Sequence, residues 1–331
     1  MPRQPRLDAP GALHHIIGRG IERTKIFQNA RDRNDFLDRL SDLCRNGNLL
    51  VYAWALMPNH FHLLARTGRQ PISHSMRKLL TGYVVNFNRR HQRYGHLFQN
   101  RYKSILCEED SYLLELTRYI HLNPLRARIV ESLEELNSYP WAGHAVLMGR
   151  MKRDWQDTDT PLSYFGKRRS EALSRYEEFV REGISQGRRP ELVGGGLIRS
   201  LGGWSQVLPL RRKGIKLASD ERILGSNAFI QGLLSEAEER ERETLRFKQK
   251  VRDLADLARD VVAEERISES DLRSGSRKRR VAQARKRFCQ LAVRKMGYSG
   301  AEVARFLGVT TSAVNRLAAS EEMSGLEGGD Q

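Results

Sequence analysis

The pattern of apolar and polar residues over the first 110 positions predicts short strands that alternate with amphipathic helices. Four β-prone apolar runs predict strands over residues 12–18, 49–56, 60–66 and 102–106. Between them, residues 29–43 and 73–92 repeat apolar side chains at helical spacing, which predicts two helices with one buried face each. Ser73 is the expected N-cap of the second helix, because a serine hydroxyl can accept a hydrogen bond from a free backbone N–H.

The order of these elements, β-α-β-β-α-β, predicts the tertiary arrangement. In the split βαβ arrangement of ferredoxin-like folds, the first and third strands lie in the middle of the sheet. A third helix is expected to begin with Asp110 or Ser111 as its cap and to run to Leu122, because Pro124 discourages its continuation. We therefore expect an α+β fold, with a ferredoxin-like core in residues 1–150 and a mostly helical region after it.

The middle of the chain carries little chemistry. The glycine runs at residues 194–196 and 202–203 lack the Gly-Lys-Ser/Thr of a phosphate loop, so they predict a turn or hinge. We find no chemical role for the run at residues 222–226. Acidic and basic residues over 235–263 recur at helical spacing, which predicts a charged helix that faces solvent.

The last segment predicts a second folded region. Cationic clusters at residues 277–280 and 285–287 are expected to begin a helix, with apolar residues at helical spacing over 281–292. Ser299 and Glu302 have the spacing of a capping box for a short helix that ends at Gly308, and Thr310 or Thr311 caps the next helix. Two short helices joined by a glycine turn predict a helix-turn-helix, although a small helical oligomerisation module has the same pattern.

The charge of the chain indicates its partner. The 331 residues include 57 Lys and Arg against 40 Asp and Glu, a formal net charge of +17, so the surface attracts polyanions, of which nucleic acid is the simplest. No stretch approaches the roughly 20 apolar residues of a membrane span. Because residues 1–10 also lack the apolar core of a signal peptide, we expect a cytoplasmic protein with no membrane partner. The three cysteines are far apart, which argues against a disulfide framework or a zinc knuckle.

Two short motifs carry candidate chemistry. His60 and His62 are separated by one residue, so on a strand both imidazoles point to the same face and can reach one metal ion. Tyr119 and Asn123 are four apart, so on a helix a phenol lies beside an amide oxygen. Each motif alone is weak, since most histidines and tyrosines are ordinary packing residues. A metal beside a phenol indicates phosphodiester chemistry.

Four separated blocks of the chain together resemble a known family. They are residues 10–20, 55–64, 95–104 and 118–127, which include Gly18-Arg19-Gly20, Pro58-Asn59-His60-Phe61-His62 and Asn123-Pro124. In this order they resemble the single-tyrosine HUH transposases, and within these the branch associated with repetitive extragenic palindromes (REP). The resemblance covers about residues 8–148.

The resemblance implies a mechanism. It implies that His60, His62 and Asn123 bind a divalent metal, Mg²⁺ or Mn²⁺, and that Tyr119 attacks a single-stranded or hairpin DNA and forms a 5′-phosphotyrosine. Arg118 and Arg126 are the candidate cations beside this tyrosine. Some relatives have the longer Gln where this chain has Asn123, so the helix here would have to lie slightly closer. A homodimer is also expected from the family.

The remaining candidates are DNA contacts. In the first region Arg101, Lys103, Arg118 and Arg126 are the basic residues expected to contact phosphates. Residues 281–318 resemble the DNA-binding domain of the bacterial chromosomal replication initiator, which implies contacts with duplex DNA. The residues implied are Arg279, Arg280, Arg285, Arg287, Thr311, Ser312, Asn315 and Arg316.

These observations predict four regions and a function. The regions are a catalytic domain at 1–150, a linker and helical region at 151–273, a helix-turn-helix at 274–320 and a tail at 321–331. The function expected is that of a metal-dependent transposase that nicks and joins single-stranded DNA near hairpins. A replication initiator or relaxase of the same superfamily is an alternative, as is a regulator that binds DNA without cleaving it.

Overall fold

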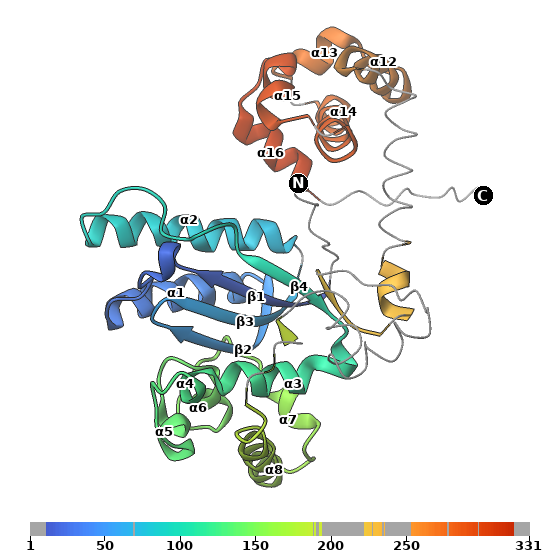
Figure 1. The fold of residues 1–331 in the computed structure, drawn as a ribbon. Coiled ribbons are helices and arrows are strands. Elements are labelled where there is room, and N and C mark those ends of the chain that lie inside the picture. Colours follow the sequence, from blue (N-terminus) through green and yellow to red (C-terminus); the bar gives the residue numbers. More distant parts are fainter. Residues whose placement is uncertain are drawn as a thin grey trace, which may run out of the picture. The chain divides into compact units, whose positions relative to one another are not determined.

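The chain forms two compact units, residues 1–233 and 234–331, each described here by itself (Figure 1). The computed structural model describes residues 11–320 apart from 69, 188, 190, 191, 194–221, 227, 234, 236–252, 277 and 297. The glycine runs expected to form a hinge lie outside the described residues, as does most of the charged segment 235–263. The expected boundary at residue 150 lies inside the first unit, and the one at residue 274 lies inside the second.

A mixed sheet forms the centre of the first unit. Its strands are β1 (Leu13–Arg19), β2 (Leu49–Met57), β3 (His60–Thr67), β4 (Lys103–Cys107) and β5 (Ile223–Leu224). They lie in the order β2-β3-β1-β4-β5, and all neighbours are antiparallel except β4 and β5, which are parallel. The first four strands begin and end within one residue or two of the predicted ranges, and β1 and β3 are inner strands as expected.

Two helices cover one face of the sheet. They are α1 (Ala30–Arg45) and α2 (Ile72–Arg90), and their apolar sides pack on the side chains of β1, β2 and β3 that point to this face (Figure 1). A capping box between Asn29 and Asp32 begins α1, and the buried Asp32 also binds Arg90 and His91, which ties the start of α1 to the end of α2. Ser73 is not the N-cap of α2, because the helix already begins at Ile72 and Pro71 occupies the N-cap position.

The opposite face carries α3 (Glu109–His121), which packs on β2 and β3 (Figure 1). The N-cap position is Glu108, so neither Asp110 nor Ser111 caps this helix. A one-turn helix follows at once, and Pro124 occupies its first turn, where a missing N–H costs nothing. The helices beyond α3 are α4 (Asn123–Arg126), α5 (Leu133–Ser138), α6 (Gly143–Leu147), α7 (Asp159–Ser163) and α8 (Arg169–Glu182).

The segment after residue 150 completes the first unit. The buried amide of Gln156 accepts a hydrogen bond from the indole of Trp54 at 2.8 Å and donates to the carbonyl of Tyr52 at 3.1 Å. The ring of Trp155 lies 5.6 Å from that of Trp54, and Asp157 N donates to the carbonyl of Val51 on the edge strand β2. This polar segment therefore belongs to the fold of the first unit.

The run at residues 222–226 extends the other edge of the sheet. Leu106 N donates to the carbonyl of Arg222, and Glu108 N donates to that of Leu224, so β5 satisfies the free edge of β4. The carboxylate of Glu108 accepts from both the backbone N–H and the hydroxyl of Ser226. The sequence did not predict this strand, because two residues are too few to show periodicity.

The second unit is helical in its described part. Its elements are α12 (Leu254–Glu265), α13 (Glu269–Arg273), α14 (Arg279–Gln290), a π-helical turn η3 (Leu291–Lys295), α15 (Gly300–Leu307) and α16 (Thr311–Ala319). The capping box of Ser299 and Glu302 begins α15, and Gly308 ends it with a φ of 68°, where a side chain would be strained. Thr310 caps α16.

The expectation that the charged segment faces solvent throughout is wrong for its described end. Leu257, Ala258 and Val261 of α12 are buried and belong to the same core as Phe288 of α14. Between its many charged residues this segment also has apolar residues at helical spacing. These apolar residues are enough to bury one side of the helix.

Candidate active site

The two histidines of the motif lie side by side on β3. Because side chains alternate along a strand, His60 and His62 point to the face covered by α3, and Phe61 points to the opposite core. Their ring centres are 5.2 Å apart. His62 is buried, and burial followed by the nearby His15 and His60 lowers its pKa well below the usual value. Burial also lowers the pKa of His60 to about 4, so both rings are neutral near pH 7.

Each of these rings has a hydrogen-bond partner on Nδ1. The Nδ1–H of His60 donates to the side-chain oxygen of Asn59 at 2.7 Å, because that oxygen can only accept. The Nδ1 of His62 lies 3.0 Å from the Nε2 of His15, which comes from the neighbouring strand β1. No described residue forms a hydrogen bond with Nε2 of either histidine. A neutral imidazole with Nδ1 bonded and Nε2 free has the form in which histidine binds metals.

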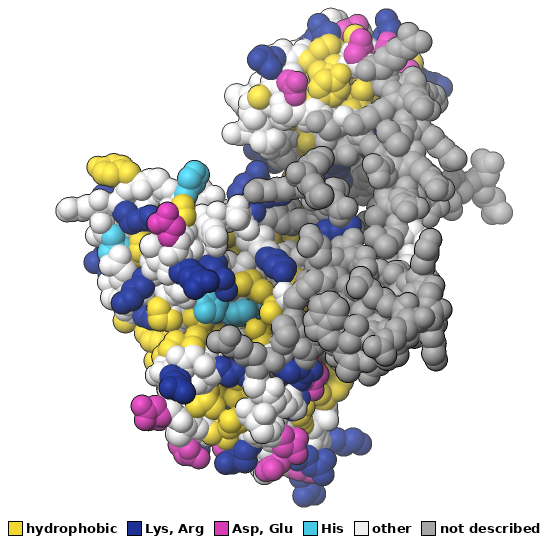
Figure 2. Space-filling model, in the orientation of Figure 1, with side chains coloured by type: hydrophobic (Ala, Val, Ile, Leu, Met, Phe, Trp, Pro, Cys, Tyr) yellow, Lys and Arg dark blue, Asp and Glu magenta, His cyan; other side chains and the backbone are white. Residues whose placement is uncertain are grey.

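Tyr119 lies beside this pair, in the last turn of α3. Its ring centre is 5.9 Å from that of His62 and 6.1 Å from that of His15, and both contacts are edge to face. The tyrosine is half-buried, so it is held by the fold and still reaches solvent. Figure 2 shows histidine side chains at the surface of the first unit beside Lys and Arg side chains.

Asn123 lies one helical turn after Tyr119, at the start of α4. Its amide nitrogen donates to the carbonyls of Tyr119 at 3.1 Å and Ile120 at 3.3 Å, which leaves its side-chain oxygen as the free acceptor. Among the residues that the structure describes, no three His, Cys, Asp or Glu side chains are grouped as a metal site. An amide oxygen as third ligand, as the sequence suggests, is outside such groups, and oxygen is the ligand atom that Mg²⁺ prefers.

The two arginines that flank the tyrosine are placed differently. The guanidinium of Arg126 lies 5.4 Å from the centre of the Tyr119 ring and donates to the Tyr119 carbonyl at 3.4 Å. Arg118 is buried, lies 4.0 Å from the ring of Phe179 and pairs with Glu115 at 2.7 Å. Arg118 therefore stabilises the packing of α8 on α3.

The end of α3 is fixed by a buried cluster of polar residues. The Tyr176 hydroxyl on α8 bonds His121 Nδ1 at 2.7 Å and His144 Nδ1 at 3.0 Å, and His144 Nε2 bonds the amide oxygen of Asn137 at 2.7 Å. Burial lowers the pKa of His144 to about 3. Burial and the neighbouring His144 lower the pKa of His121 well below its usual value. His121 lies two residues after Tyr119 in the same helix, so this cluster fixes the helix end that carries the phenol.

The other basic candidates of the first unit lie at the surface. Arg101 is exposed in the loop before β4, and Lys103 is exposed at the start of β4, where its ammonium donates to the carbonyl of Val193. Arg19 of β1 pairs in register with His60 and is exposed, so it places a positive charge beside the histidine pair. Arg19 is not among the DNA contacts expected from the sequence.

The exposed candidates of the second unit are Arg279, Arg280 and Arg287 on α14 and Thr311, Ser312, Asn315 and Arg316 on α16, whereas Arg285 is half-buried. Two arginines have partners inside the unit. Arg285 donates to four backbone carbonyls between Asp271 and Ser276, and Arg287 pairs with Glu264 at 2.6 Å and Glu265 at 3.5 Å. These two side chains stabilise the packing of α14 on α12 and α13.

Sequence reasoning missed His15 and Asn59, which contact the histidine pair. Asn59 belongs to the quoted motif, but its role depends on a side-chain contact within the hairpin turn. His15 lies within the predicted strand of residues 12–18 and belongs to neither short motif. Only the register of β1 against β3, in which Ile17 pairs with His62, shows that His15 lies diagonally beside His62.

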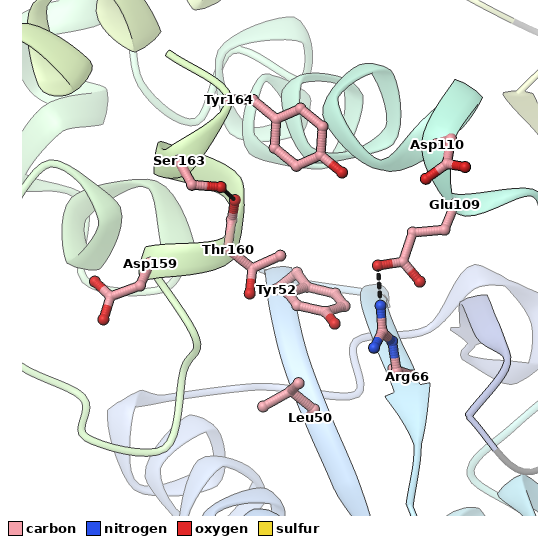
Figure 3. A pocket seen from close by; sticks show the side chains of 9 residues that line it. All are labelled: Leu50, Tyr52, Arg66, Glu109, Asp110, Asp159, Thr160, Ser163 and Tyr164. Carbon is pink, nitrogen blue, oxygen red and sulfur yellow. Dashed lines mark hydrogen bonds and ion pairs between the residues drawn. The ribbon is translucent and has the colours of Figure 1, made fainter. Parts of the chain in front are cut away.

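A pocket of about 680 Å³ lies at the other end of β3 on the same face (Figure 3). Arg66 lines it and pairs with Glu109, and Tyr164 points toward them from beside α7. Asp110 and Asp159 add two more carboxylates. Three carboxylates and one guanidinium in this lining disfavour a phosphodiester backbone, so the pocket is poorly suited to nucleic acid.

Two comparisons with known proteins gave matches. Residues 11–123 match the family model described as "Transposase IS200 like", a range that includes His15, His60, His62 and Tyr119 and ends at Asn123. A solved structure of a REP-associated tyrosine transposase bound to a REP hairpin is similar, with 15% identity and a TM-score of 0.38, over 51% of this chain and 98% of that chain. The comparison with curated proteins gave no match. No described helix has the length and apolar character needed to cross a membrane.

Proposed function

We propose that the first unit is a transposase catalytic domain of the single-tyrosine HUH type, which nicks and rejoins single-stranded DNA. The observation that carries this proposal is the position of Tyr119 on α3. Its ring centre lies 5.9 Å from the ring centre of His62 on β3. These residues are 57 positions apart in the chain, and packing brings the phenol and the two imidazoles to one place. The match of residues 11–123 to the IS200-like transposase family supports the same activity.

The strand order supports the fold that this activity uses. β1 and β2 are separated in the sheet by β3, and β4 lies outside β1, an order that supports the proposed split βαβ arrangement of a ferredoxin-like fold. In this arrangement His60 and His62 lie on an inner strand with neighbours on both sides. A site on an inner strand is positioned more firmly than one on a loop, which suits the orientation of a phosphate.

A divalent cation fits the donor set at this site. Among the described residues, none forms a hydrogen bond with the Nε2 atom of His60 or His62, and the side-chain oxygen of Asn123 is the free acceptor of its amide. We propose that these three residues hold Mg²⁺ or Mn²⁺. When bound, the ion would supply Lewis-acid polarisation of the scissile phosphate. Mn²⁺ accepts imidazole ligands more readily than Mg²⁺ does, so Mn²⁺ is the ion to use in a test of this site.

The protein residues perform the bond exchange. The Tyr119 oxygen attacks the phosphorus and loses its proton, the bond from phosphorus to the 3′ oxygen breaks, and that oxygen takes a proton to become a free 3′-hydroxyl. The product is a 5′-phosphotyrosine, which keeps the phosphodiester bond energy for rejoining. A free phenol has a pKa of about 10. Arg126, whose guanidinium lies 5.4 Å from the ring centre, stabilises the negative charge that develops on Tyr119.

For the second unit we propose binding to duplex DNA through a helix-turn-helix made of α15 and α16. The turn with Gly308, the caps Ser299 and Thr310 and the exposed polar side chains of α16 support this role. Exposed Arg279 and Arg280 at the start of α14 are suited to phosphate contacts. A DNA with a hairpin stem and a single-stranded flank provides a ligand for each unit.

The test of the proposal is a covalent adduct. The full chain is incubated with Mn²⁺ and a labelled single-stranded oligonucleotide that contains a hairpin from the DNA flanking the gene. We expect a protein–DNA adduct that resists denaturation, and we expect Tyr119→Phe to lose it. Tyr112→Phe is the matched control, because Tyr112 is a half-buried tyrosine of the same helix and packs in the same core. An adduct that persists in Tyr119→Phe would place the nucleophile elsewhere.

The same experiment separates a regulator from the enzymes. A DNA-binding regulator without catalysis would bind the hairpin and give no adduct in the wild-type chain. A replication initiator or relaxase would also form a phosphotyrosine and could rejoin it, so an adduct supports this alternative and the transposase equally. The joining step is measured by adding a donor strand with a free 3′-hydroxyl after the adduct has formed.

A further inference from the structure

We propose that His15 is a positioning residue that keeps the proton of His62 on Nδ1, so that Nε2 of His62 is available for the metal ion. The inference deepens the proposed function and rests on it, since it gives the metal site a residue outside its ligand set. Neither the family match nor the sequence motifs assign a role to this histidine.

The geometry supports a direct interaction between the two rings. His15 Nε2 lies 3.0 Å from His62 Nδ1, the ring centres are 5.2 Å apart, and the rings are inclined by 27°. His15 has no exposed surface and His62 is 5% exposed, so water does not compete for this hydrogen bond. The pair is fixed by the sheet, because β1 and β3 are neighbouring inner strands and the two residues are diagonal on one face.

The chemistry of a neutral imidazole determines the direction of this hydrogen bond. One ring nitrogen carries the proton and the other carries a lone pair. If His62 donates from Nδ1, its lone pair is on Nε2, and His15 accepts through its own Nε2 and carries its proton on Nδ1. If the direction is reversed, the proton of His62 is on Nε2, and this atom cannot bind a metal. His15 is therefore placed to decide whether His62 can be a ligand.

The neighbouring histidine shows the same arrangement with a partner whose direction is fixed. The side-chain oxygen of Asn59 can only accept, so His60 carries its proton on Nδ1 and presents the lone pair of Nε2. Two histidines of one motif thus have their Nδ1 atoms engaged by residues from outside the proposed ligand set. Partners of this kind orient metal ligands, and their loss typically costs about 10–100-fold in metal affinity.

His14 provides a matched control, because it is the adjacent residue and is equally buried. Its Nδ1 is 3.0 Å from the hydroxyl of Ser104, and alternation along β1 places it on the opposite face of the sheet. Substitution of His14 therefore removes a buried imidazole from the same strand without touching the candidate active site. Comparable losses of melting temperature in His14→Leu and His15→Leu would report the cost of the lost packing.

The first measurement is made on the full chain without metal. In protein labelled with ¹⁵N at histidine, two-bond ¹H–¹⁵N correlation spectra report which ring nitrogen carries the proton. We expect His62 of the wild-type chain to be protonated on Nδ1, and His15→Leu to shift it toward a mixture of both forms. His15→Gln, whose amide oxygen can accept, is expected to restore the wild-type form, and His14→Leu to leave it unchanged.

The second measurement is Mn²⁺ binding by calorimetry. His15→Leu is expected to bind Mn²⁺ about tenfold more weakly or worse, with His15→Gln closer to wild type and His14→Leu within about twofold of it. A wild-type His62 protonated on Nε2, or a His62 that is unaffected by His15→Leu, would overturn the inference. Failure of the wild-type chain to bind Mn²⁺ would instead overturn the metal site of the proposed function, and the spectra would still decide what His15 does to His62.

Discussion

The candidate active site depends on which atom of each side chain is left free. In His60, His62 and Asn123 one polar atom is engaged by the protein and another is available. The engaged atoms fix the orientation of the side chains before any ligand arrives, so less conformational entropy is lost on binding. Burial lowers the pKa values of both histidines, which keeps them neutral and removes protons as competitors for a cation.

Arg126 allows a prediction about the tyrosine. Arg126→Gln keeps a hydrogen-bond donor and removes the charge beside the Tyr119 ring. Because the phenol oxygen gains negative charge as it attacks, the guanidinium stabilises the transition state more than the neutral ring. A loss of about 1.4 kcal/mol of this stabilisation would slow single-turnover formation of the adduct by about tenfold. The rate is measured with Mn²⁺ and saturating oligonucleotide. Arg181→Gln, at an exposed position of α8, is the control, and equal rates in all three proteins would exclude a charge effect of Arg126.

At the scale of elements, the placement of Tyr119 depends on helices that lie far beyond it in sequence. The phenol is in the last turn of α3, where a helix end would fray if nothing held it. The hydroxyl of Tyr176 on α8 bonds His121, and Arg126 donates to the carbonyl of Gly183 just after α8. We infer that α8 makes α3, the helix that carries Tyr119, more rigid, which gives residues 169–183 a structural role.

The buried cluster at this contact predicts a dependence of stability on pH. The pKa of His144 is lowered to about 3 in the folded chain and is about 6.5 when unfolded. Between these values the unfolded chain binds a proton that the folded chain does not, so stability is full above pH 6.5 and falls as the pH decreases. Well below pH 6.5 the loss approaches about 1.4 kcal/mol per pH unit for each such histidine.

Urea unfolding of the wild-type chain at pH 7.5, 6.5 and 5.5 measures this loss, with the pH values chosen to be about one unit apart around the unfolded pKa. His144→Gln is expected to be less stable at the highest pH but to lose less stability on acidification than wild type. His74→Gln, at an exposed position of α2, should keep the wild-type dependence. An identical pH dependence in His144→Gln would show that His144 is not the group responsible.

The whole molecule combines two separately packed units with a formal net charge of +17. Each described unit has its own apolar core, so each can carry its own interaction with DNA. The boundary matters for any truncation. A cut at residue 274 would separate α14 from Leu257, Val261 and Leu272, which share its core, whereas a cut at residue 234 leaves that core intact.

We expect the chain ending at residue 233 to keep adduct formation on a short single strand and to lose high-affinity binding of duplex DNA. In the full chain, Arg316→Ala, at an exposed position of α16, should weaken specific duplex binding and leave the rate of adduct formation unchanged. Gel-shift titration and the adduct assay measure the two activities. Loss of both activities in Arg316→Ala would contradict separate roles for the units.

Much of this architecture is predictable from local sequence. The ranges of the first four strands and of α1, α15 and α16 follow from periodicity and capping residues, and Ser299 with Glu302 forms the expected capping box. The errors at Ser73 and Asp110 concern N-caps, which depend on where a neighbouring chain segment lets the helix begin. The strand β5 and the supporting role of α8 are contacts between distant segments, and no local pattern reports them.

The sequence by itself determined the alternation on β3 that aligns His60 with His62, and the helical spacing that places Asn123 one turn after Tyr119. These follow from the fixed periods of strands and helices, which need no knowledge of neighbours. Only the tertiary structure decided that His15 meets His62, that Arg126 lies over Tyr119 while Arg118 is buried, and that residues beyond 150 hold α3 in place. Register and packing set these contacts, because they depend on how whole elements bury their apolar faces against one another.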